Sequence, residues 1–224
     1  MDLLIFDLDG TLVDSKLDLA HSVNATREHF GLPKLDVATI GQYVGNGAPV
    51  LIRRAMGNGA SDADVRKALE YFLSHYDQHK LDDTRAYPGI PEALAELEAA
   101  GVRMAVLTNK PVRVSTAIIE GLGLARHFAR IYGGNSFEQK KPDPVGVNTL
   151  LADLGAARER TLMVGDSSVD VRTARNAGVK CCGVTYGFQP ESFEGDPPDM
   201  MVDRPEELAR AVIDERKTRG LINS

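Results

Sequence analysis

The 224-residue sequence has little of what marks disulfide-rich or membrane proteins. Its two cysteines, Cys181 and Cys182, are adjacent, which argues against a disulfide framework and a cysteine zinc site. No apolar run approaches the roughly 20 residues that are needed to span a bilayer. The N-terminus has no basic segment ahead of its first apolar run, so we expect no signal peptide, no membrane partner and a cytoplasmic location.

Basic residues are also fewer than acidic ones. The chain has 26 Lys and Arg residues against 32 Asp and Glu residues, a net charge of −6. Because binding to a phosphate backbone needs a basic face, this balance argues against nucleic acid as the main partner. Apolar residues make up 43% of the chain and charged residues 26%, a composition typical of globular proteins and not of disordered ones.

What the chain does have is a regular alternation of short apolar runs and helical patterns. The runs predict buried strands at 3–6, 103–107, 130–132, 161–164, 180–185 and 199–202. The patterns between them predict helices at 91–100, 111–122, 144–154, 169–176 and 205–216. Strands that alternate with helices predict an α/β fold with a doubly wound, mostly parallel sheet, covered on both faces.

One stretch, residues 15–85, departs from this alternation. It contains no evident strand, and the segments 17–30, 48–56 and 62–80 have helical spacing. Nine basic and nine acidic residues leave it neutral, so the net charge of −6 falls on the rest of the chain. We therefore predict two domains, an α/β core of residues 1–14 and 86–224 and an inserted all-helical domain of residues 15–85.

Polar side chains follow the predicted strands at the points where the strands end. These are Asp7 and Asp9, then Thr108 and Asn109, then Lys141, and then Asp166 and Asp170. Because active sites of open parallel sheets lie at the carboxyl ends of the strands, we expect these side chains to converge. Carboxylates in such proximity need a shared proton or cation, and oxygen-only ligands suit Mg²⁺.

A cation, a lysine, a hydroxyl and backbone N–H groups together bind a phosphoryl group. An aspartate beside them can attack phosphorus and form an acyl-phosphate. Each residue alone has a simpler structural explanation; a strand-end aspartate, for example, often caps a helix. The ordered set, with each member at a strand end, favours phosphoryl-transfer chemistry.

Four motifs carry a resemblance to a known family. Residues 7–11 (DLDGT), Thr108, Lys141 and residues 165–170 (GDSSVD) resemble the motifs of the haloacid dehalogenase superfamily of phosphohydrolases, which have a Rossmann-like core. The helical stretch after the first motif resembles the cap of that superfamily. Residues 7–15 (DLDGTLVDS), 44–48 (VGNGA) and 108–111 (TNKP) are further similar to bacterial phosphoglycolate phosphatases.

The resemblance implies a role for each acidic residue. Asp7 would be the nucleophile and a Mg²⁺ ligand, and Asp9 the general acid, with its backbone carbonyl on the metal. Asp166 would be the other side-chain ligand, and Asp170 would hold metal-bound water. The second aspartate, Asp9, argues against dehalogenation, because a leaving halide needs no acid.

For the substrate, the resemblance implies that Thr108 and Asn109 bind the phosphoryl oxygens and that Lys141 neutralises them and orients Asp7. A cap would determine which leaving group is accepted. Its candidates are the loop Gly45, Asn46 and Gly47, whose N–H groups precede a helix, and Arg53. A simple helix-start turn with solvated arginines is the alternative interpretation of these residues.

The sequence therefore predicts a Mg²⁺-dependent phosphomonoesterase that acts on a small ester, with 2-phosphoglycolate favoured, through an aspartyl-phosphate. The alternatives are a phosphatase for a sugar phosphate, a nucleotide or pyrophosphate, a phosphosugar mutase, and a phosphate-binding regulatory protein on the same scaffold. The pattern does not settle the oligomeric state.

Overall fold

Six parallel strands form the central sheet of the computed structural model, which describes residues 1–220, in the order β5-β4-β1-β6-β7-β8. They are β1 (Leu3–Phe6), β4 (Arg103–Leu107), β5 (Arg130–Tyr132), β6 (Thr161–Gly165), β7 (Lys180–Val184) and β8 (Met200–Val202). Every predicted strand forms, with ends that differ from the prediction by at most one residue. The predicted doubly wound parallel fold is confirmed.

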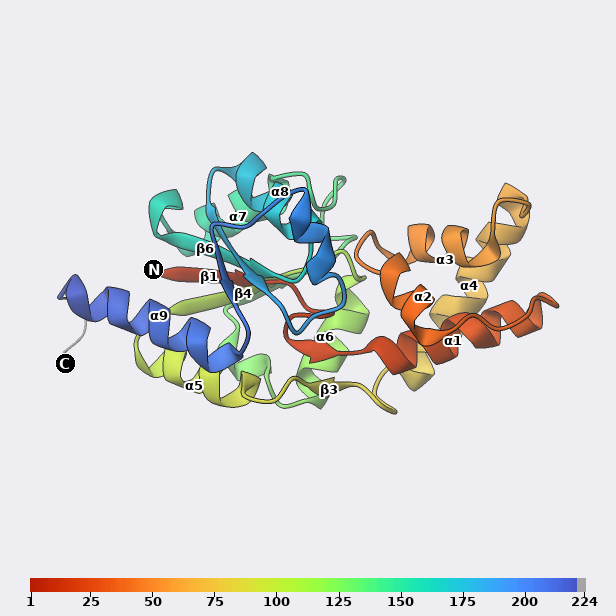
Figure 1. Cartoon of the computed structure of the whole chain (residues 1–224), viewed down its shortest axis with the longest axis horizontal. Coiled ribbons are helices and arrows are strands. Elements are labelled where there is room, and N and C mark those ends of the chain that lie inside the picture. The colour runs from red at the N-terminus through yellow and green to blue at the C-terminus, as the bar shows by residue number, and fades with distance from the viewer. Residues whose placement is uncertain (221–224) are drawn as a thin grey trace.

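Both faces of the sheet are buried, which explains why its strands are apolar without alternation. In β1, Leu4 and Phe6 pack on one face, and Leu3 and Ile5 on the other. The first face is covered by α5 (Ile90–Ala99), α6 (Val112–Gly121) and α9 (Pro205–Thr218). The second is covered by α7 (Val145–Leu154) and α8 (Ser168–Ala177) (Figure 1). Short 3₁₀ helices η1 (Ala125–His127), η2 (Arg158–Arg160) and η3 (Pro190–Glu194) lie in the connections.

Proline and glycine set the bounds of α5. The helix begins at Ile90, one residue before the predicted start, and Pro91 lies in its first turn, where no intrahelical N–H bond is lost. It ends ahead of Gly101, whose φ of +73° is left-handed. An L residue adopts that conformation only with strain, so the glycine terminates the helix there.

Four helices occupy the inserted stretch and lie together at one end of the molecule (Figure 1). They are α1 (Lys16–His29), α2 (Val37–Tyr43), α3 (Ala48–Met56) and α4 (Asp62–His79). The sequence predicted three of them. Helix α2 has only seven residues, too few for a helical period to be evident. Its N-cap is Asp36, whose side chain accepts the Thr39 N–H at 2.7 Å.

A two-stranded antiparallel ribbon, β2 (Val13–Asp14) and β3 (Arg85–Ala86), carries the chain into and out of these helices. It was not predicted, because two-residue strands have no periodicity. Beside it, the buried Asp18 carboxylate accepts the N–H groups of Asp83 and Thr84 at 2.9 and 2.8 Å. Apolar packing runs from the sheet into α1–α4 without a break, so the division into two domains stays a prediction.

Within residues 1–220, no helix combines the length and the apolar character that a membrane crossing requires.

The strand β1 should be the most sensitive part of the core. Replacement of the fully buried Leu4 by alanine removes methyl groups from a packed site and leaves a cavity, so Leu4→Ala should lower the free energy of unfolding by about 2–5 kcal/mol. The same replacement at Leu17, which is 46% exposed on α1, should cost far less. Urea denaturation of both variants measures the difference, and equal losses would contradict this account.

Candidate active site

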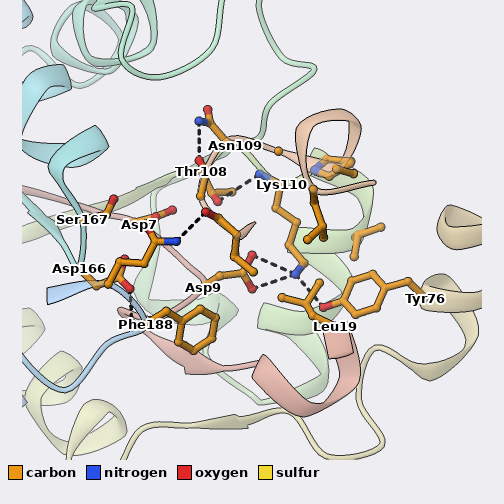
Figure 2. Close-up of a pocket in the computed structure, with 18 of the residues that line it drawn as sticks. Asp7, Asp9, Leu19, Tyr76, Thr108, Asn109, Lys110, Asp166, Ser167 and Phe188 are labelled. Carbon is orange, nitrogen blue, oxygen red and sulfur yellow. Dashed lines mark hydrogen bonds and ion pairs between the residues drawn. The ribbon is translucent and has the colours of Figure 1, made fainter. Parts of the chain in front are cut away.

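The carboxyl ends of three neighbouring strands form the floor of a pocket. Strand β1 lies between β4 and β6, so the chain leaves the sheet centre in both directions, and such a switch point is where open α/β sheets bind ligands. Asp7 follows β1, Thr108 follows β4, and Asp166 follows β6. All three line one pocket, and helices α1, α3 and α4 provide its opposite wall (Figure 2).

Lys141 joins two of the predicted carboxylates. Its buried Nζ lies 3.0 Å from Asp7 Oδ1 and 2.7 Å from Asp170 Oδ1. Burial disfavours its charge, but Asp170 and Asp7 more than offset this, so the pKa of Lys141 lies above its usual value. The other oxygen of Asp170 accepts the N–H and hydroxyl of Ser167 at 3.2 and 2.9 Å. Asp170 therefore holds Lys141 through Oδ1 and is itself held by Ser167 through Oδ2.

Three buried carboxylates, Asp7, Asp166 and Asp170, each place an oxygen within 4.8 Å of the others. Burial raises the pKa of Asp7 to about 6, with Lys141 opposing the shift and Asp170 adding to it. Burial, reinforced by Asp170 and Asp7, also raises the pKa of Asp166 well above its usual value. Negative charge is in excess in this cluster, because Lys141 is the lysine that pairs with it among residues 1–220 and the cluster has three carboxyl groups.

The free oxygens of this cluster fit a hard cation. Asp7 Oδ1 accepts the Leu8 N–H at 2.7 Å, and Asp166 Oδ2 accepts the Phe188 N–H at 2.6 Å. Within residues 1–220, Asp7 Oδ2 and Asp166 Oδ1 receive no hydrogen bond. Two unpaired carboxylate oxygens in a site with excess negative charge are a ligand set for Mg²⁺.

Two glycines make room for Asp166. A Cβ atom at Gly10, which has a φ of +78°, would overlap the Asp166 carboxylate. A Cβ atom at Gly187 would overlap the Asp166 side chain as well. The glycine of the first motif is therefore required by close packing as well as by its backbone conformation.

Thr108 and Asn109 lie where a phosphoryl group would be bound, but they differ in what they offer. The Thr108 hydroxyl accepts the Lys110 N–H at 3.3 Å, which leaves its own proton for another acceptor. The Asn109 side-chain amide donates to the carbonyls of Gly45 and Lys141 at 2.9 and 3.0 Å. Asn109 thus fastens the loop 45–47 to the core, and its backbone N–H is the group left to bind a phosphoryl oxygen.

Asp9 lines the pocket and is held by two groups through three hydrogen bonds. Lys110 Nζ donates to its two oxygens at 2.8 and 3.0 Å, and the Ser15 hydroxyl donates to Oδ1. The same ammonium donates to the Tyr76 hydroxyl at 2.7 Å (Figure 2). Burial disfavours the charge on Lys110, but Asp9 and Tyr76 raise its pKa above the usual value, so it is a cation.

The structure brings only part of the predicted cap set to the pocket. Gly45 and Gly47 line it, and both have left-handed φ angles, +103° and +85°. Arg53 does not reach it. Its guanidinium pairs with Asp62 and donates to the Ala60 carbonyl at 3.2 Å, on an outer face of α3. Helical periodicity turns Arg53 away, as the alternative interpretation of a solvated arginine implied.

Asn46 lies between the two glycines but is not part of the pocket wall.

Tyr76 and Gln189 were not predicted as site residues. Gln189 lies in the loop after β7, and its side-chain amide donates to the carbonyls of Gly41, Gln42 and Val44 at 3.2, 3.1 and 2.9 Å. Its position after the strand 180–185 is a sequence signal of the same kind as that of Asp166 after the strand 161–164. Tyr76 has no sequence signal, because nothing local distinguishes it from a core tyrosine of α4.

Comparison with known proteins now identifies the family. A family model described as "Haloacid dehalogenase-like hydrolase" matches residues 4–184. The chain belongs to this family. The predicted superfamily resemblance is therefore confirmed, and with it the prediction of an enzyme.

Individual members of the haloacid dehalogenase-like family match over nearly the whole chain. A phosphoglycolate phosphatase of Pseudomonas syringae pv. syringae is 40% identical over 95% of this chain and 80% of its own length. One from Vibrio parahaemolyticus is 40% identical over 94% of this chain and 95% of its own. The crystal structure of a predicted phosphoglycolate phosphatase from Haemophilus somnus superimposes with a TM-score of 0.89, at 31% identity, covering 94% and 97% of the two chains.

The carboxylate cluster can be tested without any substrate. Mg²⁺ should raise the melting temperature at pH 7.5, because a ligand that binds only the folded state stabilises it. The rise should vanish in Asp166→Asn and persist in Asp214→Asn, a matched exposed replacement on α9.

The same binding should weaken in acid. With a pKa of about 6, Asp7 loses its proton as the pH rises, so its ionised fraction grows from about one-tenth at pH 5 to about nine-tenths at pH 7. Mg²⁺ must displace that proton, so its apparent affinity should be about ten-fold lower at pH 5. Calorimetric titration measures this, and a constant affinity would argue against Asp7 as a ligand.

Proposed function

We propose that this hydrolase removes the phosphoryl group from 2-phosphoglycolate, with Mg²⁺, through a covalent phosphate on Asp7. The chain is a phosphoric monoester hydrolase of the haloacid dehalogenase-like family, as the family match and the named relatives support. The observation that carries the mechanism is the contact of Asp7 with Lys141 at 3.0 Å, beside Asp166 and in the pocket that Asp9 also lines.

Asp7 has the properties of a nucleophile. One of its oxygens is held by Lys141 and the Leu8 N–H, and the other receives no hydrogen bond from residues 1–220 and faces the pocket. One Asp7 oxygen would bond to phosphorus as the bond from phosphorus to the ester oxygen breaks, and the other would remain as the Asp7 ligand to Mg²⁺. Lys141, the Thr108 hydroxyl and the Asn109 N–H would bind the phosphoryl oxygens, where charge develops.

Asp9 would move the protons. It gives a proton to the departing glycolate oxygen, and it then takes one from the water that attacks the phosphoryl group on Asp7. That second step releases inorganic phosphate and restores the Asp7 carboxylate. Two steps replace one difficult hydrolysis.

Mg²⁺ would be held by the side chains of Asp7 and Asp166 and by the Asp9 carbonyl. When bound, it would offset the carboxylate charge and polarise the phosphoryl oxygens. Asp170 would hold metal-bound water and would also keep Lys141 in place, which it contacts at 2.7 Å.

Helices α1–α4 would act as a cap that excludes water. Leu19, Leu51 and Phe72 line the pocket from α1, α3 and α4, and all three are buried. An apolar wall strengthens the electrostatic contacts inside the pocket and keeps bulk water from the phosphoryl group. The relatives named phosphoglycolate phosphatase support a small ester as the substrate.

Phosphate release from a panel of esters tests this function. Purified protein with Mg²⁺ should act on 2-phosphoglycolate with a higher kcat/KM than on hexose phosphates, nucleotides or pyrophosphate. Chelation of the metal and the Asp7→Asn variant should each abolish release, and Asp214→Asn should leave it unchanged. A different preferred ester would change the substrate, and no release from any ester would overturn the proposal.

The covalent step has its own test. Asp9→Asn should slow the attack of water more than the formation of the phosphoenzyme, because the variant cannot take a proton from water. Mass spectrometry after a rapid acid quench with 2-phosphoglycolate should then show a phosphoryl adduct on Asp7. An adduct-free Asp9→Asn enzyme that still turns over would contradict the covalent route.

A further inference from the structure

The pocket contains one positive charge to which the proposed mechanism gives no task. Of the charged side chains that line it within residues 1–220, Asp7, Asp9 and Asp166 are acidic, and Lys110 alone is cationic. The Lys110 ammonium is about as buried as Lys141, with 5% of its side chain exposed. Burying an ammonium costs free energy, and within residues 1–220 the carboxylate that offsets this cost is Asp9.

We propose that Lys110 and Tyr76 form the site for the carboxylate of the leaving group, which makes the enzyme selective for short phosphorylated acids. This inference rests on the proposed function and adds to it the two residues that recognise the substrate. Lys110 would pair with the carboxylate, and the Tyr76 hydroxyl, which accepts from Lys110, would donate its own proton to the same group.

The hydrogen bonds of Lys110 indicate how it would bind a substrate carboxylate. Its three donors are used on Asp9 Oδ1 at 2.8 Å, Asp9 Oδ2 at 3.0 Å and the Tyr76 hydroxyl at 2.7 Å. Oδ1 is also held by the Ser15 hydroxyl, whereas Oδ2 is held by Lys110 alone. A bound carboxylate would take the donor from Oδ2, which frees that oxygen to reach the ester oxygen of the substrate.

Distance limits the length of the substrate. A leaving oxygen that is hydrogen-bonded to Asp9 Oδ2 lies within two hydrogen-bond lengths, about 6 Å, of the Lys110 ammonium. The carboxylate of glycolate is separated from the ester oxygen by a single carbon atom, so one molecule can contact both groups. In an extended ester with a longer chain, the carboxylate would lie beyond this distance.

The surroundings of Lys110 strengthen such a pair. The Tyr76 ring lies 4.5 Å from the ammonium and stacks on Phe72, with centroids 5.6 Å apart. Tyr76 and Phe72 are both buried, so the local polarity is low and an ion pair is worth more there than in water. The loop 45–47, which the sequence offered as a candidate to contact the leaving group, provides N–H groups but no charge.

Two substrates of equal length separate this role from others. The comparison is between 2-phosphoglycolate and 2-hydroxyethyl phosphate, which has a hydroxymethyl group in place of the carboxylate. We expect the unmodified enzyme to prefer 2-phosphoglycolate in kcat/KM by about 100-fold or more, as a site built around a paired charge does.

The variant Lys110→Met keeps the length of the side chain and removes the charge. It should lose most of that preference. Because Lys110 also holds Asp9, both esters should lose some kcat/KM, but the loss should be at least about ten-fold greater for 2-phosphoglycolate than for 2-hydroxyethyl phosphate. Tyr76→Phe should reduce the preference in the same direction by a smaller factor. Lys67→Met, an exposed lysine on α4, serves as the matched control and should change neither substrate.

The outcomes are distinct. Equal losses on both esters in Lys110→Met would mean that Lys110 only orients Asp9, and would overturn the inference. An unmodified enzyme that hydrolyses both esters equally well would also overturn it and would leave the phosphatase proposal standing. Loss of all activity in an unfolded Lys110→Met, detected by circular dichroism, leaves Tyr76→Phe to decide. An unmodified enzyme inactive on every ester would overturn both proposals.

Discussion

The buried carboxylates at one edge of the sheet are the constraint on which the rest of the site depends. Parallel strands necessarily bring the residues that follow them to one edge, so Asp7 and Asp166 meet there with Asp170. Their mutual repulsion is relieved within the protein by one ammonium, that of Lys141, which is itself fixed by Asp170. The negative charge that remains suits the site to a cation, which in turn attracts a phosphoryl group. A substitution that removes one of these charges would change that balance.

The core of the fold could be predicted from the sequence because each of its strands is buried on both faces. Such strands are uniformly apolar and stand out from their surroundings, and proline and glycine mark the ends of helices such as α5. The ribbon β2–β3 and helix α2 could not be predicted in the same way. They depend on contacts between residues far apart in the sequence, such as the hydrogen bonds that Asp18 accepts from the N–H groups of Asp83 and Thr84. A local sequence pattern does not predict such contacts.

The residues of the candidate site also fall into those that the sequence predicts and those that it does not. The strand-end residues could be located because topology alone brings them together, and they do line the pocket or, in the case of Lys141 and Asp170, hold a residue that does. Residues from the helices could not, because a helix offers several faces and only the tertiary packing selects one. Arg53 faces outward for this reason and Tyr76 inward, although both lie on helices that border the pocket.

Two consecutive residues, Phe188 and Gln189, link the floor of the pocket to the helices α1–α4. The Phe188 N–H binds Asp166, and the Gln189 amide binds three carbonyls at the end of α2. One peptide bond joins these contacts, so the residue that fastens Asp166 and the residue that fastens the end of α2 share a single stretch of backbone. The carboxylate cluster is therefore connected to the helices above the pocket through the loop after β7, in addition to the covalent route through the ribbon β2–β3.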